Sequence, residues 1–287
     1  MSLCFFVSDL HGKINRYDKL FRKIIEEKPD AVFLGGDLLP SGLFAFSSSE
    51  NIPNDFFTEI VKNGFEEVQE KLKEKYPSVF IILGNDDSKM DEESFIEGEK
   101  EGLWQYVHDR KVQFGQYSVY GYSYIPPSPF LMKDWEKYDV SRFVDPGCVH
   151  PDEGSHSFDI KKEDMLFSTI KKDLEQLSGE DNLSNAIFLF HSPPYKTKLD
   201  RAALDGKMFD YVPLDVHIGS IAIQRFINER QPLVSLHGHV HESASITGYW
   251  QDKLINTYAF SAAHEGDELA LVRFNLESLE DAERELI

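Results

Sequence analysis

The stretch Leu3–Gly12, which reads LCFFVSDLHG, decides the fold of this chain. Its apolar run Leu3–Val7 predicts a β-strand that is covered on both faces. The run ends in the polar group Ser8–Gly12, and apolar residues at helical spacing then continue to Pro29. A buried strand that ends in polar residues and leads into a helix indicates a layered α/β domain.

The same transition from an apolar strand to a polar loop recurs along the chain. The further strands are Ala31–Leu34, Val79–Leu83, Ala186–Phe190 and Pro232–Leu236, and they lead to Gly36-Asp37, Gly84-Asn85, His191 and Gly238-His239-Val240-His241, respectively. A second helix is expected over Phe57–Tyr76, so the N-terminal third forms a βαβαβ unit. Another helix is expected at about 219–230.

The remaining segments are less regular. Residues 88–185 are expected to be an insertion that contains a helix at 91–102, a hairpin turning at Gly115-Gln116, a long loop at 125–160 and a helix around 166–177. Residues 254–259 and 269–274 are predicted to be antiparallel closing strands. Residues 276–287 are acidic and are expected to be a frayed tail or a terminal helix. We therefore predict a single domain over residues 1–287.

Composition narrows the class of protein. The chain has 287 residues and a formal charge of −20, which argues against a general nucleic-acid-binding surface. It has only two cysteines, Cys4 and Cys148, so a disulfide framework is not expected. The run Leu3–Val7 is too short for a signal peptide or a membrane span. A soluble, cytoplasmic protein without a membrane partner is the expectation.

Polar residues that could bind a metal stand at five predicted strand ends. They are Asp9, His11, Asp37, Asn85, His191, His239 and His241. In α/β sheets the site lies beyond the carboxyl ends of the strands, so these side chains should converge. A mixed nitrogen and oxygen set suits Mn²⁺, Fe²⁺, Zn²⁺ or Mg²⁺, and the absence of thiolates argues against a structural zinc site. Taken singly, Asp9 could cap a helix and His191 could be a core histidine, but their joint order favours a metal centre.

The series Asp9-x-His11, Gly36-Asp37, Gly84-Asn85, His191 and Gly238-His239-x-His241 resembles the calcineurin-like metallophosphoesterase superfamily. The stretch His191-Ser192-Pro193-Pro194-Tyr195 with Gly219-Ser220 is similar to its Icc-related branch. The resemblance implies a four-layer αββα sandwich with two mixed β-sheets.

The resemblance also implies a binuclear centre. Asp9, His11 and His241 would hold one divalent ion, Asn85, His191 and His239 would hold the other, and Asp37 would bridge them. Two such ions bind phosphate oxygens and hold a bridging hydroxide for attack on phosphorus. The expected enzyme is a hydrolase of a small phosphodiester or phosphomonoester, with nucleotides as one candidate class and manganese as one candidate metal.

Three positions depart from the family pattern. Asp86 stands where the family usually has the histidine that protonates the leaving oxygen, and a carboxylate beside two cations is expected to be ionised. Either the leaving group needs little protonation, or Asp86, His237 or His217 is the catalytic acid. Pro40 replaces the tyrosine of the purple acid phosphatases, and Ile82-Leu83 replace the arginine of the protein phosphatases.

Two further groups have open interpretations. The basic cluster of Lys196, Lys198, Arg201 and Lys207 either binds an anionic part of the substrate or is a solvated loop. The tyrosines at 117, 120, 122 and 124 favour hairpin packing over stacking on a base. A non-catalytic protein-binding scaffold, like the retromer subunit that keeps this fold, is the alternative function. A DNA nuclease is disfavoured by the acidic charge. The sequence does not define the oligomeric state.

Overall fold

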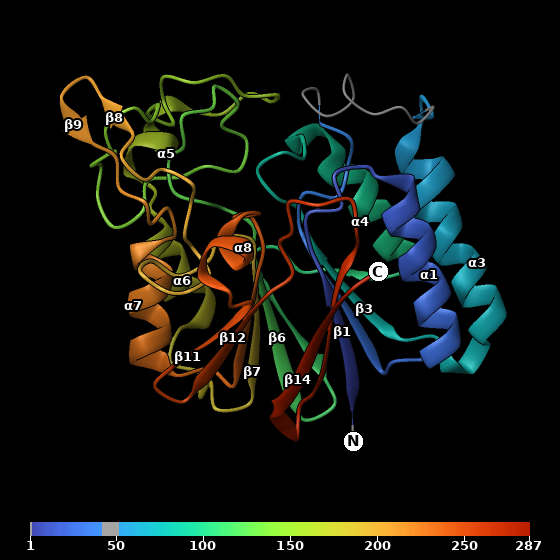
Figure 1. The fold of residues 1–287 in the computed structure, drawn as a ribbon. Helices are drawn as coiled ribbons and strands as arrows, with labels where there is room; N and C mark the ends of the chain where they lie inside the picture. Colours follow the sequence, from blue (N-terminus) through green and yellow to red (C-terminus); the bar gives the residue numbers. More distant parts are fainter. Residues whose placement is uncertain (1, 42–51) are drawn as a thin grey trace.

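A computed structural model describes residues 2–41 and 52–287 of the chain, and two six-stranded mixed β-sheets form within them. The predicted irregular loop at about 38–53 falls largely outside the described residues. The two sheets pack face to face, with helices on both outer sides (Figure 1). This is the predicted four-layer αββα arrangement.

The first sheet contains the N-terminal βαβαβ unit. Its order is β14 (Ser278–Leu286), β13 (Ala270–Asn275), β1 (Leu3–Val7), β2 (Ala31–Gly35), β3 (Ser78–Ile82) and β4 (Gln105–Tyr106). Strands β1, β2, β3 and β4 pair in parallel, whereas β13 is antiparallel to both β1 and β14. The parallel strands therefore end at one common edge.

The second sheet contains the remaining motif-bearing strands. Its order is β11 (Gln251–Leu254), β12 (Thr257–Ser261), β10 (Val234–His237), β7 (Ala186–Phe190), β6 (Tyr117–Tyr122) and β5 (Arg110–Phe114). Strands β12, β10, β7 and β6 are parallel, and the two edge strands are antiparallel to their neighbours. A short hairpin, β8 (Met208–Phe209) with β9 (Val212–Pro213), lies outside both sheets.

Three apolar layers stabilise the sandwich, one between the two sheets and one between each sheet and its helices. Phe6, Phe33 and Ile187 belong to a fully buried layer made by the two facing sheets. On the outer face of the first sheet lie α1 (Ile14–Glu27), α3 (Asn63–Leu72) and α4 (Glu92–Lys100), and on that of the second lie α6 (Ile170–Ser178) and α7 (Ile221–Arg230) (Figure 1). Because both faces of the central strands are covered, β1, β2 and β7 are continuously apolar, as their sequences predict.

Several expected elements form with changed boundaries. The predicted helix over Phe57–Tyr76 is divided into a π-helical turn at Phe57–Lys62, α3, and a 3₁₀ turn at Lys73–Lys75. A 3₁₀ turn at Lys89–Asp91 precedes α4. The helix expected around 166–177 is two helices, α5 (Lys162–Phe167) and α6, because Thr169 is extended and caps α6 through its side chain.

Residues 88–185 contribute strands to both sheets. They provide β4 to the first sheet and β5 and β6 to the second, and the hairpin turns at Gly115-Gln116 as predicted. Within residues 125–160 the chain forms only isolated bridges, in agreement with the expected long loop. No helix among the described residues is long and apolar enough to cross a membrane.

One prediction near the C-terminus is wrong, and a second holds only in part. The acidic residues 276–287 are neither a frayed tail nor a helix, because β14 pairs along β13 and Arg273 bonds to Glu285 across the pair. The expected antiparallel strand at 269–274 does form, as β13 between β1 and β14, whereas the segment 254–259 matches the prediction only in part. The nearest strands, β12 and β13, belong to different sheets, and β12 runs parallel to β10.

Candidate metal centre

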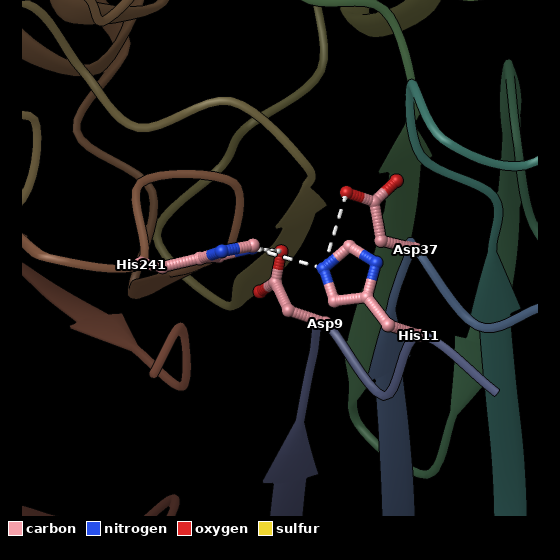
Figure 2. A group of neighbouring side chains, drawn as sticks. All are labelled: Asp9, His11, Asp37 and His241. Carbon is pink, nitrogen blue, oxygen red and sulfur yellow. Dashed lines mark hydrogen bonds and ion pairs between the residues drawn. The ribbon is translucent and has the colours of Figure 1, made fainter. Parts of the chain in front are cut away.

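The parallel strands β1, β2, β3, β7 and β10 place their C-terminal ends at one edge of the sandwich. The loops after β1, β2 and β10 bring Asp9, His11, Asp37 and His241 together, and one ligand atom from each lies within 4.8 Å of the others (Figure 2). Asn85 and His191, from the ends of β3 and β7, meet the same group through Asp37. The structure thus gathers the polar residues that the sequence singled out.

Strained backbone aims these side chains. Asp9, His11, Asp37 and His239 all have positive φ, at 57°, 47°, 53° and 74°, which non-glycine residues rarely adopt. Such strain costs on the order of 1–3 kcal/mol per residue and is found at functional sites. The loops support one another, because Asp9 N donates to Gly36 O and His11 N donates to Asp37 O. The four conformations are therefore held by contacts between neighbouring strand ends.

Glycine is needed where the loops cross most closely. A Cβ atom on Gly238 would lie 2.0 Å from Ser8 Oγ and 2.7 Å from Asp9 Oδ2. A Cβ atom on Gly84 would lie 2.3 Å from Asp37 Oδ1. Only glycine allows the β10 and β3 loops to approach the aspartates, which explains its place before His239 and Asn85.

The first group of ligand atoms surrounds Asp9. His11 Nε2 lies 3.0 Å from His241 Nε2, and His241 Nε2 lies 3.2 Å from Asp9 Oδ1. Asp37 Oδ2 is 3.9 Å from His11 Nε2. The other oxygen of Asp9 accepts a hydrogen bond of 2.5 Å from Ser8 Oγ. Two nitrogens and two carboxylates thus face a common point.

The second group surrounds His191. Its Nε2 lies 3.0 Å from Asn85 Oδ1 and 3.3 Å from Asp37 Oδ2. The ring of His239 is 5.3 Å from the ring of His191, centroid to centroid. Asp37 belongs to both groups, which is the position that the resemblance assigned to a bridging ligand.

Hydrogen bonds fix which atoms face inward. His191 Nδ1 donates to Gly35 O over 2.7 Å, so in the neutral ring Nε2 carries a lone pair. Asn85 Nδ2 donates to Asp86 Oδ1, which turns the amide oxygen of Asn85 toward His191. Lone pairs of a nitrogen, an amide oxygen and a carboxylate then converge, and they need a proton or a cation between them. This donor set fits a hard or borderline divalent ion.

Even without a bound ion, burial and the charges within the cluster shift the pKa values of its members. Burial disfavours the charged form of His191, but Asp37 and Asp9 outweigh it and raise its pKa to about 10. Burial also opposes ionisation of Asp9, yet its hydrogen bond to His241 holds its pKa well below the usual range. Burial lowers the pKa of His11 to about 4 and that of His239 to about 3. These two rings are therefore neutral ligands near pH 7, the form that binds metals.

Asp86 lies at the rim of the cluster with its side chain 28% exposed. Its main-chain N donates to Asp37 Oδ1 over 2.8 Å, and its Oδ2 is 3.6 Å from His11 Nδ1. Burial and the charge of Asp37 raise the pKa of Asp86 to about 7. Two bound cations would instead lower this pKa. The pKa is raised in the protein alone because the neighbouring charge is the carboxylate of Asp37.

His237 is not placed to act as the catalytic acid, which corrects that expectation. Its side chain is fully buried, Nδ1 lies 2.9 Å from Ser192 O, and Nε2 lies 2.8 Å from Ser235 Oγ. Its ring stacks on Phe190 at an interplanar angle of 5°. Val234 and Leu236 pack between the two sheets, so alternation along β10 points His237 to the opposite face, where Phe190 lies. His217 bonds to the buried carboxylate of Asp200 over 2.8 Å rather than to a member of the cluster.

The other open groups have structural explanations. In the basic cluster, Lys198 pairs with Asp252 and Arg201 pairs with Asp205. Among the tyrosines, Tyr120 and Tyr122 are buried and donate to Asp181 and Asp173. Hairpin packing, the favoured interpretation, therefore accounts for these two aromatic residues.

Sequence reasoning missed Asp87, which is 1% exposed. Its Oδ1 accepts hydrogen bonds from Leu38 N and Leu39 N, and its Oδ2 accepts one from Gly84 N. It therefore ties the loop that carries Asp37 to the loop that carries Asn85. The available signal was a second acidic residue after Asp86, at a strand end where one turn-forming residue suffices.

Comparison with known proteins agrees with this geometry. The sequence model of the calcineurin-like phosphoesterase family matches residues 4–243, which is most of the chain and contains the whole cluster. No protein with a curated functional description matches the sequence.

Solved structures share the fold at low sequence identity. The protein TT1561 of Thermus thermophilus superposes with a TM-score of 0.54 at 15% identity, covering 99% of this chain and 98% of the other. The phosphopantetheinyl hydrolase of Mycobacterium tuberculosis superposes with a TM-score of 0.50 at 11% identity, covering 93% of this chain and 91% of the other. At these identities the likeness supports the fold alone.

Proposed function

Because the chain belongs to the calcineurin-like phosphoesterase family, we propose that it is a binuclear-metal phosphoesterase. The observation that carries the proposal is the convergence of lone pairs from two histidine groups on a shared Asp37. Such a set binds divalent cations, and the family match supports hydrolysis of phosphoric esters as the activity.

Each ligand has a proposed role. Asp9, His11 and His241 would hold the first ion, Asn85, His191 and His239 would hold the second, and Asp37 would contribute to both sites. Two such ions would supply Lewis acidity, which lowers the pKa of a bound water and offsets charge on a phosphoryl group. Gly35 O fixes the tautomer of His191, and Ser8 orients Asp9 by donating to its second oxygen.

A small phosphodiester or phosphomonoester is the proposed substrate. The net charge of −20 disfavours an extended polyanion such as nucleic acid, because the surface would repel it outside the metal centre. With two ions bound beside it, Asp86 would be ionised and would be a poor acid for an alkoxide leaving group. Esters with acidic leaving groups are therefore the better substrates.

Metal analysis combined with parallel phosphatase assays tests the proposal. We expect the purified chain to bind two equivalents of Mn²⁺ and to hydrolyse bis-aryl or mono-aryl phosphate in a metal-dependent way. Asp37→Asn should lose at least about 100-fold in activity, because it weakens a ligand shared by both ions. Asp18→Asn, on the exposed face of α1, is the matched control and should be unaffected.

Two results would contradict the proposal. One is the failure of the wild-type chain to bind any divalent ion, and the other is full activity in Asp37→Asn. Metal binding without hydrolysis of any phosphoric ester would favour the alternative of a non-catalytic scaffold.

A further inference from the structure

Arg16 is a buried cation in an unfavourable place. It lies in the first turn of α1, is only 2% exposed, and is not accompanied by an acidic residue in that turn. The positive end of the helix dipole repels a cation there and burial removes water from the guanidinium, whereas the carboxylates of Asp9, Asp267 and Glu268 favour its charge. Such a local cost is expected where a residue serves the function of the site.

The side-chain hydrogen bonds of Arg16 go to main-chain carbonyls, one of which belongs to Asp9. Nη1 donates to Asp9 O, and Nη2 donates to Gly266 O over 2.5 Å and to His264 O over 3.4 Å. Asp9 is the ligand whose φ of 57° puts its main chain in the left-handed region. The guanidinium therefore holds the main chain of Asp9 just after the end of β1 at Val7.

The other carbonyls belong to a sixth strand end at the same edge. The loop at residues 262–266 follows β12, which pairs in parallel with β10, the strand that leads to His239 and His241. Lys13 Nζ also donates to Gly266 O, over 3.2 Å, and Arg284 Nη2 from β14 donates to Ala263 O over 2.7 Å. Arg16 thus braces the Asp9 loop against a loop that two further cations hold in place.

We propose that Arg16 is a positioning residue for the metal ion at Asp9, an inference that rests on the proposed function. By holding Asp9 O, it fixes the carboxylate whose Oδ1 accepts a hydrogen bond of 2.9 Å from His239 N and faces His241 Nε2. Loss of the guanidinium leaves a buried carbonyl without this donor and lets the Asp9 peptide leave the left-handed region. One ligand position would then be displaced.

Titration calorimetry with Mn²⁺ on the full chain tests the inference without using catalysis. We expect Arg16→Met to bind one of the two Mn²⁺ equivalents about 10–100-fold more weakly, the usual effect of losing a partner that orients a ligand. Arg22→Met removes a guanidinium from an exposed position of the same helix and is the matched control. At saturating Mn²⁺, Arg16→Met should regain most of its kcat, because all seven ligand side chains remain.

Urea unfolding in the presence of a chelator separates positioning from stability. If Arg16 only stabilises the fold, its replacement lowers the free energy of unfolding and leaves the Mn²⁺ affinity of the folded protein unchanged. That result would overturn the inference. If Arg16→Met does not fold, Arg16→Lys replaces it, since an ammonium lacks the planar fork with which the guanidinium bonds Asp9 O and Gly266 O. Wild-type affinity in Arg16→Lys would then equally contradict the inference. Absence of Mn²⁺ binding in the wild-type chain would instead refute the proposed function.

Discussion

Asp87 gives the sharpest test of how the metal-binding loops are held. Its carboxylate accepts hydrogen bonds from Leu38 N at 2.9 Å, Leu39 N at 2.8 Å and Gly84 N at 2.9 Å. Leu38 directly follows Asp37, and Gly84 directly precedes Asn85. Replacing Asp87 with asparagine changes the acceptors and leaves the size of the side chain almost unaltered.

The expected magnitude follows from the hydrogen bonds that are lost. An amide has one oxygen, so its NH2 group must face either Gly84 N or the pair Leu38 N and Leu39 N. At least one buried N–H then loses its acceptor, which costs about 1–3 kcal/mol. Asp87→Ala removes the acceptor from all three donors and should cost on the order of 3 kcal/mol or more in unfolding free energy.

Two measurements on the same variants check this reasoning. Urea unfolding with a chelator present gives the loss of stability from the shift in midpoint at constant slope. Calorimetry with Mn²⁺ gives the effect on the site, and we expect Asp87→Asn to bind about 10-fold more weakly or worse because both flanking loops relax. Asp18→Asn, at an exposed position, should change neither quantity.

Equal stability of Asp87→Asn and the wild-type chain would refute the argument from unsatisfied donors. A large loss of stability with unchanged Mn²⁺ affinity would refute the step from the loops to the metal centre. The two parts of the reasoning can therefore fail separately.

The remaining predictions concern other buried polar groups and the rim. Burial lowers the pKa of His108 well below 6.5, so the unfolded chain binds a proton that the folded chain excludes. Acidification from about pH 7 to about pH 5 should therefore lower the unfolding free energy of the wild type by about 2 kcal/mol more than that of His108→Gln. Urea unfolding with a chelator present measures this difference. Lys133→Met removes the cationic partner of the buried Glu136 carboxylate and should lower the free energy of unfolding by about 3–5 kcal/mol. The double variant Lys133→Met/Glu136→Leu should recover much of that stability in thermal unfolding. Asp86→Ala should lose activity on alkyl phosphates more than on aryl phosphates if Asp86 is the acid, and unchanged rates on both would exclude it from that role.

The ligand cluster could be predicted from sequence because each ligand belongs to a strand end. The apolar runs define where the strands stop, and parallel strands must end at a common edge, so Asp9, Asp37 and His191 converge whatever the loops do. The same reasoning does not give φ, tautomers or the orientation of Asn85. Those depend on contacts between loops that are distant in sequence.

The wrong predictions share a physical cause. The strand β14 is an edge strand rich in charge, because its outer side faces solvent, so its composition resembles a tail. His237 and His239 are two residues from each other in sequence, yet β10 ends between them and their rings enter different surroundings. Arg16 was missed because its partners are backbone carbonyls, which no side-chain pattern records.

The main chain explains why the family pattern can lose a histidine at position 86 without losing the metal centre. At this position it is a peptide N–H that contacts the proposed bridging ligand, because Asp86 N donates to Asp37 Oδ1 over 2.8 Å. Any residue except proline supplies that donor. The contact to Asp37 therefore does not depend on the side chain at 86, although Asp86 Oδ1 also accepts a hydrogen bond from Asn85 Nδ2. Asp86→Ala keeps the donor to Asp37 and loses the partner of Asn85 Nδ2, so its Mn²⁺ affinity should fall by no more than about 10-fold even where its activity on alkyl esters falls further.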